Sequence, residues 1–250
     1  MKKKIIALSI TAVLIISAVV GGTFAYLTDK DYAENVMVLG NVDIIQNEYE
    51  HDASGALVSF TQNKPLYPYV GNVSWADTGA YRSFAMENVV DKYVTVKNTG
   101  KSDAYVRTIF AFQMGDFTIE EFDKYIGISA NYANGSAFQA PGTWNWEVEV
   151  ADAMVVEFEG ERYCIIAAVH ENAIAKDEET IPSLLQVYLT NTADNAEVAK
   201  LNAHSTDYTY DILALSQAAQ TNGFTSAADA LNTAFGEITP ANVVAWFTAE

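Results

Sequence analysis

Apolar residues in the first half of the chain form short runs of the length of β-strands. Residues 36–39 and 42–45 are largely apolar at successive positions, which is typical of strands covered on both faces. Residues 93–97 and 104–112 show apolar alternation instead, and the segment 98–102 between them consists of turn-forming residues. We therefore predict that 93–97 and 104–112 form a β-hairpin.

The second half of the chain continues with short strand patterns. The predicted strands are residues 144–150, 154–158, 162–169, 184–190 and 208–215. They are separated by turn residues, without the strand–helix alternation of a parallel sheet. The sequence thus predicts a mainly β fold, an antiparallel β-sandwich.

Short helices are predicted as additions to this framework. Residues 118–125 open with a capping box, in which a threonine hydroxyl and a glutamate three positions later satisfy each other's backbone amides. Apolar residues at helical spacing over 224–235 predict a second helix, with Gly236 as its stop. A proline suited to a first helical turn opens the third helix, 239–247, within a C-terminal helical segment that spans 224–250.

The first 25 residues have the order of a signal peptide. Three lysines precede an apolar run of 16 residues, and small residues stand three and one positions before a break. A membrane-spanning helix needs roughly 20 strongly apolar residues, so that this run is marginal as an anchor. We expect cleavage at a site formed by Thr23, Ala25 and Tyr26, which leaves residues 26–250 as a single domain. An uncleaved N-terminal anchor is the alternative.

The charge of the chain limits its partners. Its formal net charge is −18, and loss of the three lysines in residues 1–25 would make the mature chain −21. A field of this sign repels nucleic acid and anionic membranes, so we expect no nucleic-acid partner and only transient membrane contact through the signal peptide. Export predicts a secreted or cell-surface protein. Cys164 is the only cysteine, and its apolar surroundings predict a buried side chain.

No catalytic pattern is visible in the sequence. The chain has three histidines, His51, His170 and His204, and the one start of a zincin motif, at His170, fails because Ile174 stands where a second histidine is needed. A nucleophile elbow and a phosphate-binding loop are also missing. We therefore expect no catalytic residue, no bound metal and no cofactor.

Four segments together resemble the TasA/camelysin family of secreted Gram-positive proteins, which are processed by a SipW-type signal peptidase. The most specific is 21–29 followed by 39–44, which is similar to the family's cleavage site and first strand. The other three are 96–107, 163–189 and 212–235. This resemblance implies a jelly-roll-like β-sandwich with peripheral helices.

The resemblance also implies a function. Well understood family members assemble into extracellular fibres of the biofilm matrix, in which the N-terminal segment of one subunit supplies a strand to the next. The expected partners are therefore further copies of this chain, joined head to tail, and other matrix proteins. The donor segment would be residues 26–39, with the apolar side chains Val36, Met37, Val38 and Leu39. The alternative is that this segment folds back into its own subunit.

Two other functions stay open. The camelysin branch of the family suggests a cell-surface metallopeptidase, although no metal-binding motif is present to carry that activity. A binding module that presents Trp75, Trp144 and Trp146 to a polysaccharide or a protein is the third hypothesis, but residues 144 and 146 share one face of a predicted strand and suit a core equally. The segment 50–81 matches no motif of the family, and the sequence predicts no role for it.

Overall fold

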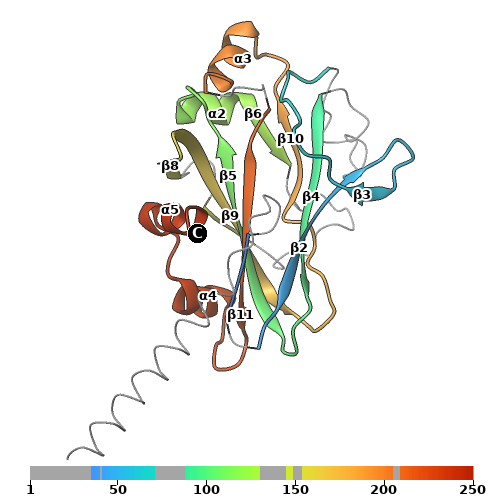
Figure 1. The fold of residues 1–250 in the computed structure, drawn as a ribbon, viewed down its shortest axis with the longest axis vertical. Coiled ribbons are helices and arrows are strands. Elements are labelled where there is room, and N and C mark those ends of the chain that lie inside the picture. Colours follow the sequence, from blue (N-terminus) through green and yellow to red (C-terminus); the bar gives the residue numbers. More distant parts are fainter. Residues whose placement is uncertain are drawn as a thin grey trace, which may run out of the picture. The chain divides into compact units, whose positions relative to one another are not determined.

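Two β-sheets packed against each other form the framework of the described chain (Figure 1). The first sheet contains, in spatial order, β1 (Asn35–Leu39), β11 (Ile212–Gln220), β5 (Ala104–Gln113), β9 (Glu161–Ile174) and β7 (Asn145–Val148), and β8 (Met154–Phe158) also pairs with β9. The second contains β3 (Leu57–Ser59), β2 (Ile44–His51), β4 (Val89–Asn98), β10 (Leu184–Leu189) and β6 (Ile126–Ser129). Pairs of these strands are antiparallel, except that β1 runs parallel to β11.

The computed structural model describes part of the chain. The described residues are 35–39, 41–70, 88–129, 145–148, 154–204 and 209–249, with the backbone alone for 35–39, 129 and 145–148. All of them belong to the compact unit Ala33–Ala249. Within these residues, no helix has the length and apolar character needed to span a membrane.

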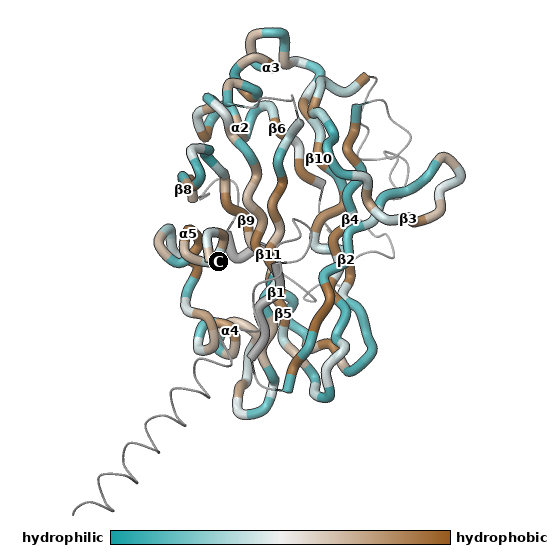
Figure 2. The backbone as a smooth tube through the Cα atoms, in the orientation of Figure 1, coloured by the Kyte–Doolittle hydropathy of each residue, from teal (hydrophilic) through white to brown (hydrophobic). Residues whose placement is uncertain are grey.

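The main hydrophobic core lies between the sheets. Strand β5 contributes Phe110 and Phe112, and β10 contributes Leu184 and Leu189, all of which are buried. Figure 2 shows hydrophobic residues along these middle strands and hydrophilic residues in the turns at the strand ends. A second cluster covers the outer face of the first sheet, where residues of β5, β8 and β9 pack against residues of the C-terminal segment 238–247.

Short helices flank this framework, as the capping signals predict. The helices of the described residues are α2 (Ile119–Tyr125), α3 (Asn195–Leu201), α4 (Ala227–Phe235) and α5 (Pro240–Phe247). Thr118 closes the predicted capping box of α2, and α4 ends at Gly236. Sequence reasoning missed α3, although Asp194 and Glu197 form a capping box of the same kind there.

The predicted fold class is confirmed, because the structure is mainly β, with two sheets and short helices. The strand bounds differ most at β11, which was expected at 208–215. Its second half is rich in alanine and carries Ser216 and Gln217, so that its composition resembles a buried strand poorly. The structure satisfies those two polar side chains internally, as described below.

The predicted hairpin is wrong. Strand β4 pairs with β2 and β10, whereas β5 pairs with β11 and β9 in the other sheet. The connecting turn is bonded to the chain before β2: Thr99 and Gly100 both donate to the carbonyl of Asp43, at 2.8 and 2.9 Å, and Lys101 donates to that of Asn41. These bonds hold the turn at the point where the chain passes from one sheet to the other. The composition of the turn alone did not reveal this crossing.

Candidate functional site

Strand β1 forms the edge of the first sheet. It pairs along β11 from Asn35 opposite Leu215 to Leu39 opposite Ala219. The predicted donor residues 36–39 therefore lie in a strand of their own chain, as the fold-back alternative has it, while the rest of the predicted donor, 26–34, lies outside the described residues. Among the described strands, β1 pairs with β11 alone and therefore ends the strand order of the first sheet, which is a position from which a strand can be exchanged.

Ser216 anchors β11 on the inner side of the sandwich. Its hydroxyl is fully buried and donates to Oε1 of Gln46, in β2 of the opposite sheet, at 2.7 Å. A second hydroxyl, that of Thr108 in β5, lies 3.1 Å from it. Gln46 in turn lies 3.4 Å from the carbonyl of Ala214. These contacts tie β11 to β2 across the core.

Arg107 anchors β11 on the outer side. This fully buried side chain extends from β5, and its Nε donates to Oε1 of Gln217 at 2.7 Å. Its two terminal nitrogens donate to Oδ1 of Asn232 in α4 and to the carbonyl of Gly236, both at 2.8 Å. The guanidinium group also lies 5.2 Å from the ring centre of Trp246 in α5. One cation thus joins β5, β11, α4 and α5.

The segments that carry the family resemblance contribute strands to both sheets. Part of β5, most of β9 and all of β11 lie side by side in the first sheet, in the order β11-β5-β9, whereas all of β10 lies in the second sheet and only Leu39 of β1 is included. Arg107, at the end of the second segment, and Gln217, in the fourth, lie opposite each other in the register and share a hydrogen bond. Both residues fall within segments that carry the resemblance, but the sequence alone could not pair them, because 110 positions separate them.

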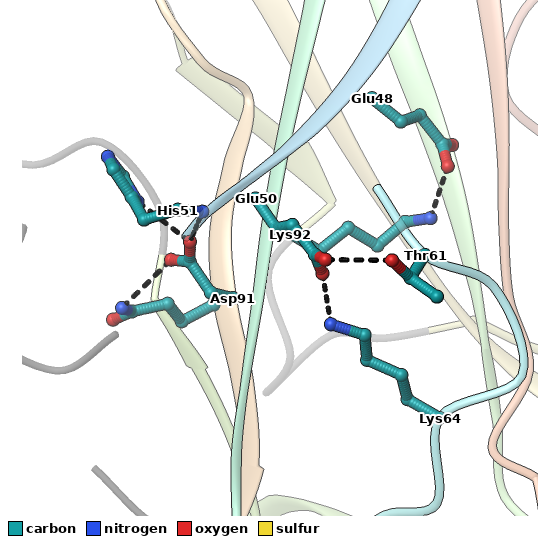
Figure 3. Close-up of polar contacts among 8 residues, drawn as sticks. Glu48, Glu50, His51, Thr61, Lys64, Asp91 and Lys92 are labelled. Atoms are coloured by element: carbon teal, nitrogen blue, oxygen red, sulfur yellow. Dashed lines mark hydrogen bonds and ion pairs between the residues drawn. The ribbon is translucent and has the colours of Figure 1, made fainter. Parts of the chain in front are cut away.

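A polar cluster occupies the second sheet (Figure 3). Nζ of Lys92 lies 2.5 Å from Oε2 of Glu48, and both side chains are largely buried. Lys64 pairs with Glu50, which also accepts a hydrogen bond from Thr61. These contacts lower the pKa of Glu50 against the opposing effect of burial, which is the largest single influence on it. The cluster balances charge inside the fold without bringing a nucleophile and a base together.

His51 belongs to a separate buried group beside this cluster (Figure 3). Its Nδ1 lies 2.7 Å from Oδ2 of Asp91, whose other oxygen accepts a hydrogen bond from Gln186 at 3.1 Å. The backbone amide of His51 donates to the same carboxylate at 2.6 Å. The ring of Tyr93 meets the imidazole edge to face, at 4.8 Å between centres. The carboxylate thereby fixes the end of β2 to β4.

The three histidines lie apart. His170 is buried between the sheets, where its Nε2 lies 3.1 Å from Oγ of Ser183, and burial lowers its pKa to about 4. His204 contacts Asp116 on the surface. Nowhere in the described ranges do three histidine, cysteine, aspartate or glutamate side chains gather as metal ligands. The donors in that part of the chain do not fit a catalytic zinc ion, which needs three protein ligands.

The remaining candidate residues divide between core and undescribed segments. Cys164 is buried as predicted, and burial raises its pKa to about 12, which keeps the thiol protonated and unreactive. The cleavage-site residues Thr23, Ala25 and Tyr26 lie outside the described residues, as do Trp75 and Trp144. Trp146 stands in β7, whose side chains are not described.

A comparison with protein-family models finds a match at the N-terminus. Residues 1–53 match the family model of the camelysin metallo-endopeptidases, over a stretch that includes β1 and β2. This match confirms the resemblance to the TasA/camelysin family. No curated protein and no solved structure matches the chain significantly. The family assignment therefore rests on the N-terminal segment and does not by itself choose between a matrix subunit and a peptidase.

Proposed function

We propose that this protein is a secreted structural subunit of an extracellular matrix, which assembles into fibres when β1 of one copy pairs with β11 of another. The observation that carries the proposal is the position of β1. It lies at a sheet edge, makes the one parallel pairing between named strands of the described chain, and precedes every other described element. A strand that precedes all other described elements in the chain can pair with the same edge of another copy while those elements keep their own pairing.

The exchange would conserve the contacts seen within one chain. The five residue pairs from Asn35–Leu215 to Leu39–Ala219 would be remade by the same residues of two copies. Where each copy receives its strand from one neighbour and gives its own to a different neighbour, the pairing runs head to tail and extends into a filament, provided that the rotation between copies does not close a ring. The family match supports this proposal at its N-terminal segment, where β1 lies.

Disulfide trapping tests the proposal. Val38 and Ala218 are register partners, so the double variant Val38→Cys, Ala218→Cys, made with Cys164→Ala, places two thiols on adjacent strands. After residues 26–250 have assembled, oxidation is expected to give a ladder of covalently linked chains on a non-reducing gel. The single variant Val38→Cys is the control and can give dimers at most.

Electron microscopy of the same samples gives a second measure. Filaments are expected from residues 26–250, and none from a chain that begins at residue 40 and lacks β1. Crosslinking within single chains alone, together with an absence of filaments from the long form, would overturn the proposal.

A metallopeptidase is the second candidate, since the matching family model carries that description. The histidine, cysteine and carboxylate side chains of the described residues do not fit a catalytic zinc ion, so no step is assigned to one. Metal analysis of the purified protein and chelator-sensitive cleavage of casein test this candidate. One equivalent of zinc together with metal-dependent proteolysis would favour it over the structural role.

A further inference from the structure

Two polar residues stand at the centre of the edge that β1 occupies. Ser216 and Gln217 lie opposite Val36 and Met37, in the middle of the five paired positions. Otherwise β11 consists of aliphatic and alanine residues, apart from Gln220 at its end. Successive residues of a strand point to opposite faces, and these two are accordingly held from opposite sides, Ser216 by Gln46 and Gln217 by Arg107.

Both contacts are fully enclosed. Ser216, Gln217 and Arg107 have no exposed surface, and Gln46 is 2% exposed. A buried polar group that loses its partner keeps the full cost of its desolvation. A displacement of β11 would therefore break the enclosed hydrogen bond between Ser216 and Gln46 on one side and the bond between Gln217 and Arg107 on the other. The aliphatic and alanine residues of the strand, by comparison, impose little preference on its position.

These anchors do not involve β1. They join β11 to β2, β5 and α4, so they persist when the neighbouring edge is vacated. We propose that Gln46 and Ser216 on the inner side, with Arg107, Gln217 and Asn232 on the outer side, form a two-sided clamp that keeps β11 ready to accept a strand. The C-terminal helices thereby become part of the strand-accepting site, since the outer half of the clamp ends on α4 and its cap.

The clamp deepens the proposed function, because a β1 from another copy would meet the same prepared edge. If the free edge of β11 were disordered, it would have to become ordered before another β1 could pair with it. The free-energy cost of that ordering would weaken binding, so an edge that is already ordered binds more tightly. The clamp also acts on a subunit that keeps its own β1. It can therefore be tested without fibres.

Hydrogen exchange on residues 26–250 is the first test. The variants Gln46→Met and Gln217→Met each remove one half of the clamp while keeping an unbranched side chain of similar length. We expect exchange of the β11 amides to quicken by at least about tenfold relative to β10, the size of effect that loss of one buried hydrogen bond to a charged or enclosed group produces. Asn232→Ala, at a half-buried position, serves if Gln217→Met does not fold.

Ser226→Ala is the matched control. Ser226 caps α4, and its loss weakens the same helix without touching Arg107. Exchange of β11 that rises equally in this control, or in none of the variants, would overturn the clamp.

The trapping assay supplies the second readout. When the clamp variants are combined with the Val38→Cys and Ala218→Cys pair, the yield of linked chains is expected to fall, with Ser226→Ala unaffected. An undiminished yield contradicts the clamp and leaves the fibre proposal standing. Quickened exchange of β11 in a protein that never forms filaments contradicts the fibre proposal and leaves the clamp standing.

Discussion

The buried imidazole of His170 makes stability depend on pH in a way that can be worked out from the structure. His170 is 3% exposed, and burial lowers its pKa to about 4, against about 6.5 in an unfolded chain. Between these values the unfolded state binds more protons than the folded state, so the free energy of unfolding decreases as pH falls. A difference of about 2.5 pKa units corresponds to roughly 3 kcal/mol, lost between about pH 6.5 and pH 4.

Urea unfolding at a series of pH values measures this effect. The variant His170→Gln removes the titrating group. Between pH 7 and pH 4 its free energy of unfolding is expected to fall by about 3 kcal/mol less than that of the parent protein. His204→Gln is the control, because His204 is 44% exposed at its side chain and contacts Asp116 at the surface. The acidic side chains are the same in all three proteins, so their contribution to the pH dependence of stability cancels in the comparison. Equal pH dependence in His170→Gln and the parent would refute the reasoning.

Three further predictions concern single positions. Gly100→Ala places a Cβ 2.6 Å from the amide nitrogen of Asp43, and should lower the free energy of unfolding by about 1–3 kcal/mol in thermal or urea unfolding. In Gly160→Ala the Cβ meets no atom within 4 Å, but the residue has a φ of +83°, so this variant should lose only about 1 kcal/mol. A larger loss in Gly160→Ala than in Gly100→Ala would contradict the steric argument. Thr118→Ala removes the cap of α2 and should cost about 1 kcal/mol, with circular dichroism to confirm an otherwise intact fold. Cys164 should resist alkylation at pH 8 until urea unfolds the protein, and rapid labelling of the native state would contradict its burial.

Local patterns in the sequence were sufficient for much of the framework. Alternation located β5, a capping box located α2, helical spacing with a helix-stopping glycine located α4, and the single cysteine was correctly placed in the core. Each of these features depends on interactions within a few residues, or on the apolar character of one segment. Such interactions can be predicted from the sequence without knowledge of the fold.

The clamp residues could not be found in this way. Arg107 in a strand pattern reads as an exposed position, since arginine is rarely buried unless its donors are satisfied. Its acceptors Gln217, Asn232 and Gly236 lie more than 100 positions away and are brought to it by the pairing of β5 with β11 and by the packing of α4. The spacing of these residues in the sequence therefore does not predict that they meet. The same limit explains the false hairpin, because the turn at Gly100 is bonded to residues before β2.

The place of β11 near the end of the chain has a consequence for assembly. Residues 35 and 215 form a pair but are 180 positions apart, so β1 has no edge to join until most of the chain has been made. When β1 pairs within its own chain, closing so long a loop costs conformational entropy. When it pairs with another copy, no such loop closes, and the cost depends instead on the concentration of that copy. Folding at low concentration should therefore favour subunits closed on their own β1, and folding at high concentration should favour linked ones.

This competition can be measured by refolding residues 26–250 over a range of concentrations and trapping the product through Val38→Cys and Ala218→Cys. The ratio of linked to closed chains should rise with concentration during refolding. It should change little when folded, closed subunits are concentrated afterwards, because β1 must first leave an edge that the rest of the sheet holds in place. A ratio independent of refolding concentration would mean that the edge of β11 never becomes accessible to another copy.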